Sequence, residues 1–426
     1  MLVEVGGSSG AQSVMWFLRH CKASWFRSVD VIPRTIKRDP RRMFAWLSHL
    51  RLRRIITSNR FIPEVDGFRF LAIVLVIAAH VFVQLDPPVG NGLFPTLFKR
   101  AVGDGKVGVY LFFTISGFIL ALPFARHNLQ DAKPVKLGSY FRRRLTRLEP
   151  PYILAMVGRF PMVALYKHAA IGVVAVHLVA SLFYVHSLVY NAYSTINPPA
   201  WSLEVEVQFY ILAPLLAAVF YVRPAILRRL ILVAAVCGTA YASNAWINPS
   251  SRVALTLLAF SQYFLAGFLL CEIYLSQSHP RLPRVLWDML GLLALGWILF
   301  GTAYPVYLVS LPFATILLYL AGFHGWAVRG FFAFPAVSII GGMCYSLYLT
   351  HTLVLTGVSV LLRHLHLSRL PMGLGTPAIF ALCFAAVLAL GTVFYVLIER
   401  PCMDPEWPQK LARKLRAAPK AQVVKS

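Results

Sequence analysis

The sequence predicts an all-α fold, in the form of a polytopic bundle of transmembrane helices. Of its 426 residues, 58% are hydrophobic and only 13% are charged, whereas roughly 25% of the residues in a soluble domain are charged. Long apolar segments recur along most of the chain, and each is close to the roughly 20 residues that a helix needs to cross a bilayer. Length alone would allow two or three soluble domains, but these segments leave no soluble catalytic domain to be placed.

Hydropathy predicts ten spans and one exceptional segment. The segment 168–190 is also long enough to cross, but counting it would move the arginines of the 222–228 loop to the outer side. We therefore expect a re-entrant or outer-surface helix there. The ten spans, allowing a few residues at each end, are expected at 68–86, 106–125, 150–167, 203–221, 229–247, 254–275, 285–304, 307–323, 335–362 and 375–398.

The distribution of charge predicts the orientation in the membrane. The formal net charge is +25, and basic residues crowd both ends of the chain and the loops between spans. Short loops rich in Lys and Arg stay cytoplasmic, so we expect a multi-pass protein of the cell inner membrane with both termini in the cytoplasm. Attraction to anionic membrane lipids explains the remaining excess, and we expect no nucleic-acid partner. The loops placed inside are 126–149, 222–228, 276–284 and 324–334.

The chain divides into three regions. Residues 64–402 form the transmembrane domain, and residues 403–426 form a basic cytoplasmic tail. Residues 1–63 form a basic cytoplasmic extension, whose mixture of Trp, Phe, Leu and Arg is typical of helices on a membrane surface; a partly disordered tail fits equally well. The six cysteines are scattered, which predicts neither a disulfide framework nor a metal site.

Arg69 and His80 are the most informative residues, because both lie inside the first span. An ionisable residue in a bilayer costs several kcal/mol unless it is paired or faces a polar cavity, so its default interpretation is a functional site. Their spacing of eleven residues is close to three helical turns, which places both on one helix face about 16 Å apart. We therefore expect a polar ligand to enter from one side and reach about half the membrane depth.

Three further segments place polar residues at or in later spans. Arg144 and Arg147 share a helix face at the entrance to the third span, where guanidinium groups suit phosphates, although an ordinary positive-inside anchor explains them as well. Glu204 and Glu206 cannot both face one cavity, since residues two apart on a helix diverge by about 200°. His351 lies in the ninth span; it either bonds a neighbouring helix or completes a polar site with His80.

In this order, the segments resemble the acyltransferase 3 family of integral-membrane acyltransferases, which includes bacterial O-acetylases of surface polysaccharides. The resemblance covers residues 64 to about 402. In the family pattern the acid of the fourth motif falls five positions after Trp, which selects Glu206, and the second Glu that often follows is Val207 here. The matching motifs are Arg69 with His80, GVYLFFTISGF at 108–118, Arg144 with Arg147 before Pro150, WSLEVEVQFY at 201–210, YSLYLTH at 345–351 and Glu399-Arg400-Pro401.

The resemblance implies transfer of an acyl group, commonly acetyl, from cytoplasmic acyl-CoA (acetyl-CoA) to a hydroxyl of a carbohydrate or glycolipid acceptor, without a metal. His80 is the candidate base, since imidazole titrates in the right range. Arg144 and Arg147 would hold the CoA phosphates, while Arg69 would engage the CoA or stabilise charge on the thioester oxygen. Glu206 and His351 complete the set of candidate catalytic residues.

A transporter or flippase of a polar or lipid-linked solute is the alternative, because charges inside a polytopic bundle also mark solute pathways. It fits less well, since the sequence has no internal repeat and no matching pair of spans broken by Gly or Pro. A structural scaffold would leave Arg69 and His80 without a reason.

Overall fold

The computed structural model describes most of the predicted transmembrane domain. The described residues are 52, 54–55, 61–85, 93–103, 105–166, 170–276, 282–364, 372–404, 406–410 and 413. The predicted surface helices of the N-terminal extension and most of the C-terminal tail lie outside them.

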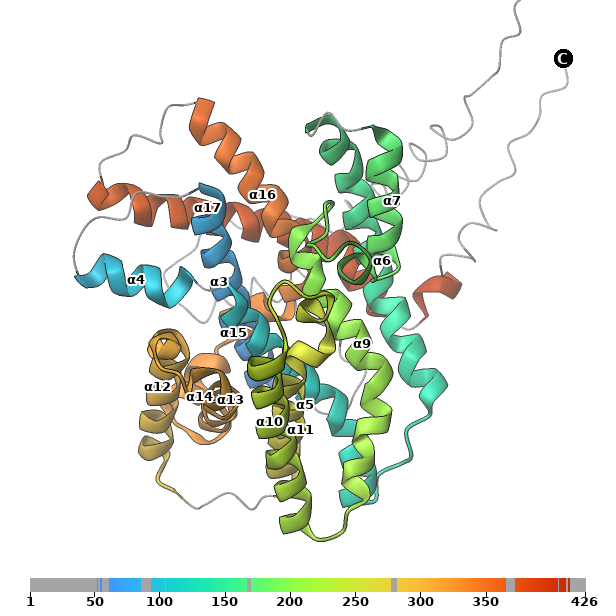
Figure 1. Ribbon diagram of the computed structural model, residues 1–426, viewed down its shortest axis with the longest axis vertical. Helices are drawn as coiled ribbons and strands as arrows, with labels where there is room; N and C mark the ends of the chain where they lie inside the picture. The colour runs from blue at the N-terminus through green and yellow to red at the C-terminus, as the bar shows by residue number, and fades with distance from the viewer. Residues whose placement is uncertain are drawn as a thin grey trace, which may run out of the picture. The chain divides into compact units, whose positions relative to one another are not determined.

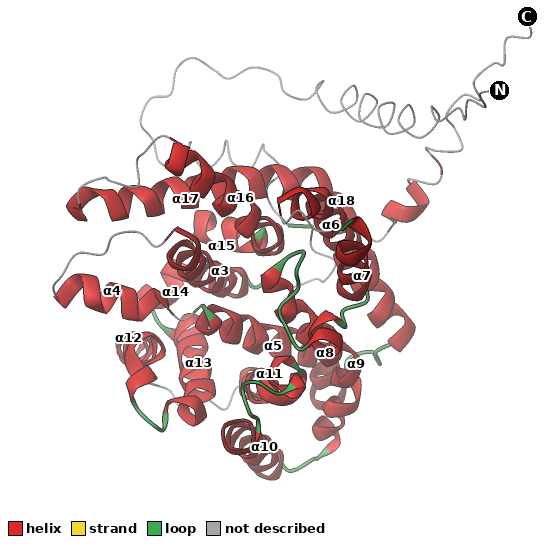
Figure 2. Cartoon of the chain, turned by 45° about the horizontal axis from the view of Figure 1, so that its top comes forward, coloured by secondary structure: helices red, strands yellow, loops and turns green. Residues whose placement is uncertain are grey.

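The described residues form helices and no strand (Figures 1 and 2). The first half comprises α3 (Pro63–Leu85), α4 (Leu93–Gly103), α5 (Lys106–Gln130), α6 (Leu137–Tyr166), α7 (Ile171–Leu182), α8 (His186–Tyr190), η2 (Pro198–Ala200), α9 (Trp201–Leu216) and η3 (Ala217–Tyr221). The second half comprises α10 (Ala225–Trp246), η4 (Arg252–Leu255), α11 (Leu257–Ser276), α12 (Arg284–Phe300), η5 (Gly301–Ala303), α13 (Tyr307–His324), α14 (Ala327–Phe332), α15 (Pro335–Gly342), α16 (Cys344–His364), α17 (Met372–Phe394), η7 (Tyr395–Glu399) and α18 (Arg400–Cys402).

Eight of these helices are long and apolar enough to cross a membrane, which confirms an all-α polytopic membrane protein. The remaining two predicted spans correspond to α6 and α12, which are helical but are not among these eight. α12 has only 17 residues, and α6 starts with a strongly basic stretch. The eight are Pro63–Leu85, Lys106–Gln130, Pro198–Tyr221, Ala225–Trp246, Arg252–Ser276, Tyr307–His324, Cys344–His364 and Thr376–Cys402.

The predicted span 335–362 is wrong as a single helix. α15 ends at Gly342 and α16 begins at Cys344, because the chain passes so close to α3 that a Cβ on Gly341 would overlap the backbone oxygen of Asp66. Two consecutive glycines also weaken a helix. The ninth span is therefore α16 alone, with α15 as a short helix packed on α3.

The exceptional segment 168–190 does not form one long helix. α7 has 12 residues, about 18 Å of helix, which is short of the roughly 30 Å hydrocarbon core. The chain then turns at Tyr184, whose φ of 57° is left-handed, and continues as the five-residue α8. A segment of this shape is in keeping with the predicted re-entrant or surface position.

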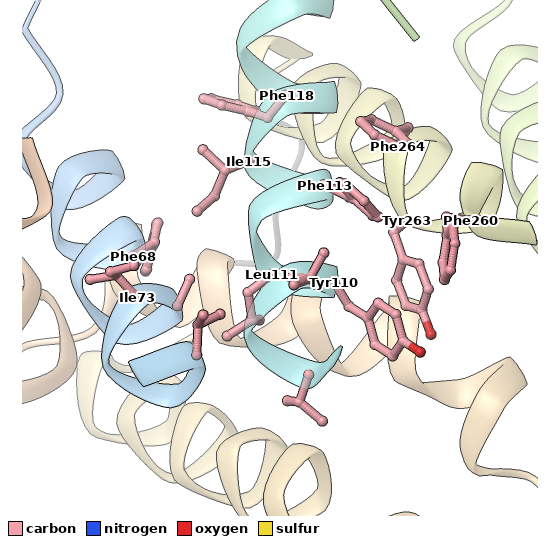
Figure 3. Packing of buried hydrophobic residues seen from close by; sticks show 14 of the residues in the cluster. Phe68, Ile73, Tyr110, Leu111, Phe113, Ile115, Phe118, Phe260, Tyr263 and Phe264 are labelled. Atoms are coloured by element: carbon pink, nitrogen blue, oxygen red, sulfur yellow. The ribbon is translucent and has the colours of Figure 1, made fainter. Parts of the chain in front are cut away.

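The most extensive contact between two helices joins α5 to α11 (Figure 3). Gly117 and Gly267 face each other there: a Cβ on Gly117 would lie 2.2 Å from the Phe264 backbone oxygen, and one on Gly267 would lie 2.3 Å from the Thr114 oxygen. Small residues allow such close approach between membrane helices. Beside the glycines, the rings of Phe113 and Phe264 stack with their centroids 4.6 Å apart.

α3 lies against α5, α15 and α16, and this arrangement positions the polar residues of the first span (Figures 1 and 2). Its core-facing residues pack into the cluster that includes Phe68 and Ile73. On the far side of α11, Glu272 is fully buried and binds Arg228 and Arg229 of α10, each at 2.7 Å. This ion cluster fixes α10 to α11.

We expect Gly117→Ala to lower the free energy of unfolding by about 1–3 kcal/mol, because the added methyl group forces α5 and α11 apart. Gly238→Ala is the matched control, since a Cβ there meets nothing within 4 Å. Thermal unfolding of the purified protein in detergent measures both. Equal midpoints for the two variants would contradict this packing.

Candidate active site

A cavity of about 390 Å³ lies between α3, α5, α6, α9, α16 and the end of the last long helix. Five arginines and three carboxylates line it, so it carries net positive charge. Three tyrosines, two serines and a threonine add hydroxyl groups to its wall. The charged and polar lining residues include Arg54, Asp66, Arg69, Ser116, Arg143, Arg144, Arg147, Glu206, Tyr210, Tyr345, Tyr348 and Glu399.

Arg69 lines the cavity as an ion pair. Its Nη1 donates to Asp66 Oδ1 one helical turn earlier at 2.5 Å, and Arg54 donates to the same oxygen at 3.2 Å. Asp66 is 3% exposed, so a single buried carboxylate serves two guanidinium groups. Sequence reasoning missed Asp66, although an acid three residues before an intramembrane arginine signals a counter-charge.

Arg144 and Arg147 both reach the cavity from α6, as their three-residue spacing predicts. The Arg144 guanidinium lies 3.7 Å from the Tyr140 ring centroid and 5.5 Å from that of Tyr210. Burial lowers the pKa of Arg144, but arginine starts so far above neutrality that the side chain stays cationic. The buried Nε of Arg147 has no hydrogen-bond partner among the described residues. Arg147 can therefore form a further hydrogen bond.

The two acids of α9 separate as expected from their spacing. Glu206 lines the cavity and accepts a hydrogen bond from Ser116 at 2.5 Å. Glu204 is fully buried and accepts from the backbone N–H of Ser187 at 2.9 Å. Glu204 therefore stabilises the start of α8, while only Glu206 is available to a ligand in the cavity.

Glu399 reaches the cavity from η7, a π-helical turn at the end of the last long helix. Its carboxylate accepts hydrogen bonds from the N–H and hydroxyl of Ser346, at 3.0 and 2.5 Å. It thus anchors the first turn of α16. Arg147 lies close enough for its charge to act on Glu399, but the two groups make no ion pair at contact distance within the described part of the chain.

His80 and His351 lie side by side, with their ring centroids 4.8 Å apart and their planes nearly perpendicular. His80 Nδ1 lies 2.8 Å from the Val76 carbonyl oxygen, and His351 Nδ1 lies 2.7 Å from that of Tyr348. A carbonyl oxygen can only accept, so each Nδ1 carries the proton and each Nε2 keeps its lone pair. His351 Nε2 is buried without a partner. Both imidazoles are therefore in the tautomer of a base.

The histidine pair lies at a different depth from the arginines. α3 is continuous from Pro63 to Leu85, so Arg69 and His80 are about 16 Å apart along it. Neither histidine lines the cavity. Tyr348 connects the cavity with the histidine pair: it lines the cavity, and its ring centroid lies 5.6 Å from that of His351. We call the two depths the arginine level and the histidine level.

Tyr348 is held firmly in this position. Its hydroxyl donates to the Pro199 carbonyl at 2.6 Å and lies 2.6 Å from the Ser202 hydroxyl. Sequence reasoning placed Tyr348 in the ninth span but assigned it no role. It also missed Ser116 and Tyr210, which carry no signal beyond their motifs.

Within the described ranges, no group of three or more His, Cys, Asp and Glu residues is arranged to hold a metal ion. The candidate site thus consists of a cationic cavity at the arginine level and two neutral imidazoles at the histidine level. Together with the helical bundle, these features define a polytopic membrane protein with a positively charged internal cavity.

The chain belongs to the acyltransferase family 3. The family model, described as an acyltransferase domain, matches residues 62–396. This confirms the family resemblance found from the motifs, and it covers nearly the whole of the predicted transmembrane domain.

Similar proteins with curated names include several from Staphylococcus aureus. A protein of strain COL that is provisionally named an O-acetyltransferase is 26% identical over 334 residues, which are 70% of this chain and 51% of that protein. O-acetyltransferase OatA of strain NCTC 8325 is 25% identical over 326 residues, 69% of this chain and 50% of that protein. The chain therefore spans about half the length of the curated relatives it matches. No solved structure matches it.

Substitutions at the two acids of α9 should differ in their effect on stability. We expect Glu204→Ala to lower the free energy of unfolding by about 1 kcal/mol or more, since it removes the group that caps α8. Glu206→Gln keeps the bond to Ser116 and should unfold close to the unchanged protein. Thermal unfolding in detergent compares the two, and a larger loss in Glu206→Gln would contradict the assignment.

Proposed function

We propose that this protein transfers an acyl group, acetyl in the simplest case, from acyl-CoA to a hydroxyl group of a saccharide or glycoconjugate. The observation that carries the proposal is the pairing of a cationic cavity with two imidazoles in the tautomer of a base. The cavity is large enough for part of a cofactor, since about 390 Å³ falls within the range of small-molecule sites. The names of the Staphylococcus aureus relatives support O-acetylation.

Acyl-CoA binds at the arginine level in this proposal. Arg144 and Arg147 hold its phosphates, because guanidinium groups form strong charge-assisted bonds to phosphate oxygens. The buried, unpaired Nε of Arg147 favours such a ligand. The pantetheine arm is about 15–20 Å long, so the thioester reaches the histidine level, about 16 Å away, while the nucleotide stays among the arginines.

This geometry favours one of the two roles expected for Arg69. A guanidinium about 16 Å from His80 is too far away to stabilise the oxygen of a thioester that reacts at the histidine level. Arg69 lines the cavity beside its counter-ion Asp66. It therefore contributes to CoA binding rather than to the chemical step.

The reaction at the histidine level is a simple acyl exchange. The acceptor hydroxyl attacks the thioester carbon while Nε2 of His80 takes the hydroxyl proton. The carbon–sulfur bond then breaks, and the proton passes to the leaving thiolate, which gives an ester and free CoA thiol. The imidazole of His351 lies beside that of His80, with the ring centroids 4.8 Å apart. An acyl-histidine intermediate gives the same products in two steps.

The orientation follows from where each substrate is found. CoA is a cytoplasmic polyanion that does not cross a bilayer, so the arginine level faces the cytoplasm. The basic loop that leads into α6 is then cytoplasmic, as the positive-inside rule requires. The acceptor approaches the histidine level from the outer side of the inner membrane, which suits modification of a cell-surface polysaccharide.

Removal of both cavity arginines should abolish donor binding. We expect Arg144→Gln/Arg147→Gln to weaken acetyl-CoA binding by about 100-fold or more, since each charge-assisted bond is worth about 1.5–3 kcal/mol. Binding of labelled acetyl-CoA to membranes containing the protein measures this. Arg142→Gln is the matched control, because Arg142 lies on the same helix, is exposed and does not line the cavity.

His80→Ala should lower CoA release by about 10²–10⁴-fold, the usual contribution of a general base, while acetyl-CoA binding stays unchanged. Release of CoA thiol in the presence of a crude cell-envelope acceptor is the measurement. A fully active His80→Ala variant would exclude this role. An unchanged protein that neither binds nor consumes any acyl-CoA would favour the transporter alternative.

A further inference from the structure

Arg159 is the intramembrane arginine that the donor site leaves unexplained. It lies on α6 twelve residues after Arg147, about 18 Å further along the helix, and its charge acts on His351. It therefore belongs to the histidine level. α6 therefore spans the same two levels as α3. It carries Arg147 at the arginine level and Arg159 at the histidine level.

The partners of Arg159 are all neutral. Its Nε donates to the Ile196 carbonyl at 2.9 Å, and its Nη1 donates to the Thr352 hydroxyl at 2.8 Å. Thr352 in turn donates to Asn197 Oδ1 at 3.0 Å. No described carboxylate lies at ion-pair distance from Arg159, and its Nη2 makes no hydrogen bond to a described residue.

Two other arginines of the bundle differ in this respect. Arg69 binds Asp66, and Arg228 binds Glu272. A charge in the apolar interior is costly unless it is compensated, so a guanidinium supplied only with neutral acceptors lacks part of its coordination. An anion from outside the protein completes it.

Two further polar groups close to Arg159 are buried and unpartnered. Asn197 is fully buried and its Nδ2 donates to no described residue, and His351 Nε2 also has no partner among these residues. Because Thr352 binds both Arg159 and Asn197 and follows His351 in sequence, these groups form one cluster. A cation without a counter-ion and an amide donor are suited to an oxyanion. The imidazole nitrogen, which keeps its lone pair, is suited to a neighbouring hydroxyl group.

The helix surface beside Arg159 is open. A Cβ on Gly158 would meet no atom within 4 Å, and Val157 is 46% exposed. We call Arg159, Asn197, Thr352 and His351 the Arg159 cluster. Arg159 keeps part of its surface exposed, whereas the other three residues are buried, so a ligand on this side of the bundle meets Arg159 first.

We propose that the Arg159 cluster is the acceptor subsite and that it recognises an oxyanion carried by the acceptor, a phosphate or a carboxylate close to the hydroxyl that is acylated. This rests on the proposed function and adds the class of acceptor to it. Arg159 holds the anion, Asn197 Nδ2 donates to it, and the neighbouring hydroxyl points to the Nε2 atoms of the histidine pair. The acceptor is then an acidic saccharide or a saccharide linked to a prenyl phosphate.

Binding of simple probes to the purified protein in detergent tests the proposal. The probes are farnesyl phosphate for a prenyl phosphate, octyl glucuronide for an acidic sugar and octyl glucoside as the neutral control, all with saturating CoA to fill the donor cavity. We expect at least one anionic probe to bind about tenfold or more tightly than octyl glucoside. The probe that binds tighter identifies the source of the anion.

Variants of Arg159 separate recognition from structure. We expect Arg159→Met to lose the preference for the anionic probe, and Arg159→Lys to keep most of it, since it retains the charge. Arg363→Met is the matched control, because Arg363 is exposed and bonds only within α16. All variants should bind acetyl-CoA as the unchanged protein does.

Equal binding of neutral and anionic probes, or a preference that survives Arg159→Met, would overturn the proposal. Equal losses in Arg159→Met and Arg159→Lys, together with a lower unfolding temperature, would make Arg159 a structural link between α6 and α16. Failure of the unchanged protein to bind acetyl-CoA would instead reject the donor site, and the anion preference would stand as a separate result.

Discussion

Charges inside an apolar bundle have to be compensated within the protein or by its ligands, and this constraint organises the whole molecule. Asp66 neutralises part of the charge of Arg69 and Arg54, and Glu272 does the same for the arginines of α10. Where compensation is incomplete, as at Arg147, the structure has a cavity. A buried pair such as Arg228 with Glu272 joins two helices, whereas the arginines that line the cavity outnumber its carboxylates.

In the proposed function, the division into two levels answers a physical difficulty of acylation across a membrane. A highly charged donor cannot leave the aqueous phase, and a surface acceptor cannot enter the cytoplasm. Long helices would solve this by carrying cations at one depth and imidazoles at another. The close glycine contact between α5 and α11 contributes rigidity, because it leaves no room for the two helices to slide past each other.

Sequence reasoning predicted most of the fold and the main candidate residues, because a bilayer restricts the possible structures so strongly. Hydropathy located the spans, and three-turn spacing placed Arg69 and His80 on one helix. It failed at the break before Cys344, since close contact with α3 depends on packing that no local pattern records. It also overlooked Asp66, although Arg69 lies only three residues away. Arg159 was missed because its role depends on a neighbour distant in sequence, Thr352.

The adjacent imidazoles impose a limit on proton storage. Two rings 4.8 Å apart in an apolar interior cannot both become cations, because like charges at that distance repel strongly. In the proposed reaction the pair therefore accepts one proton for each acyl group and must release it before the next acceptor reacts. The acyl group passes to the acceptor while one proton passes to CoA, so this exchange moves no net charge through the membrane and draws no energy from the membrane potential.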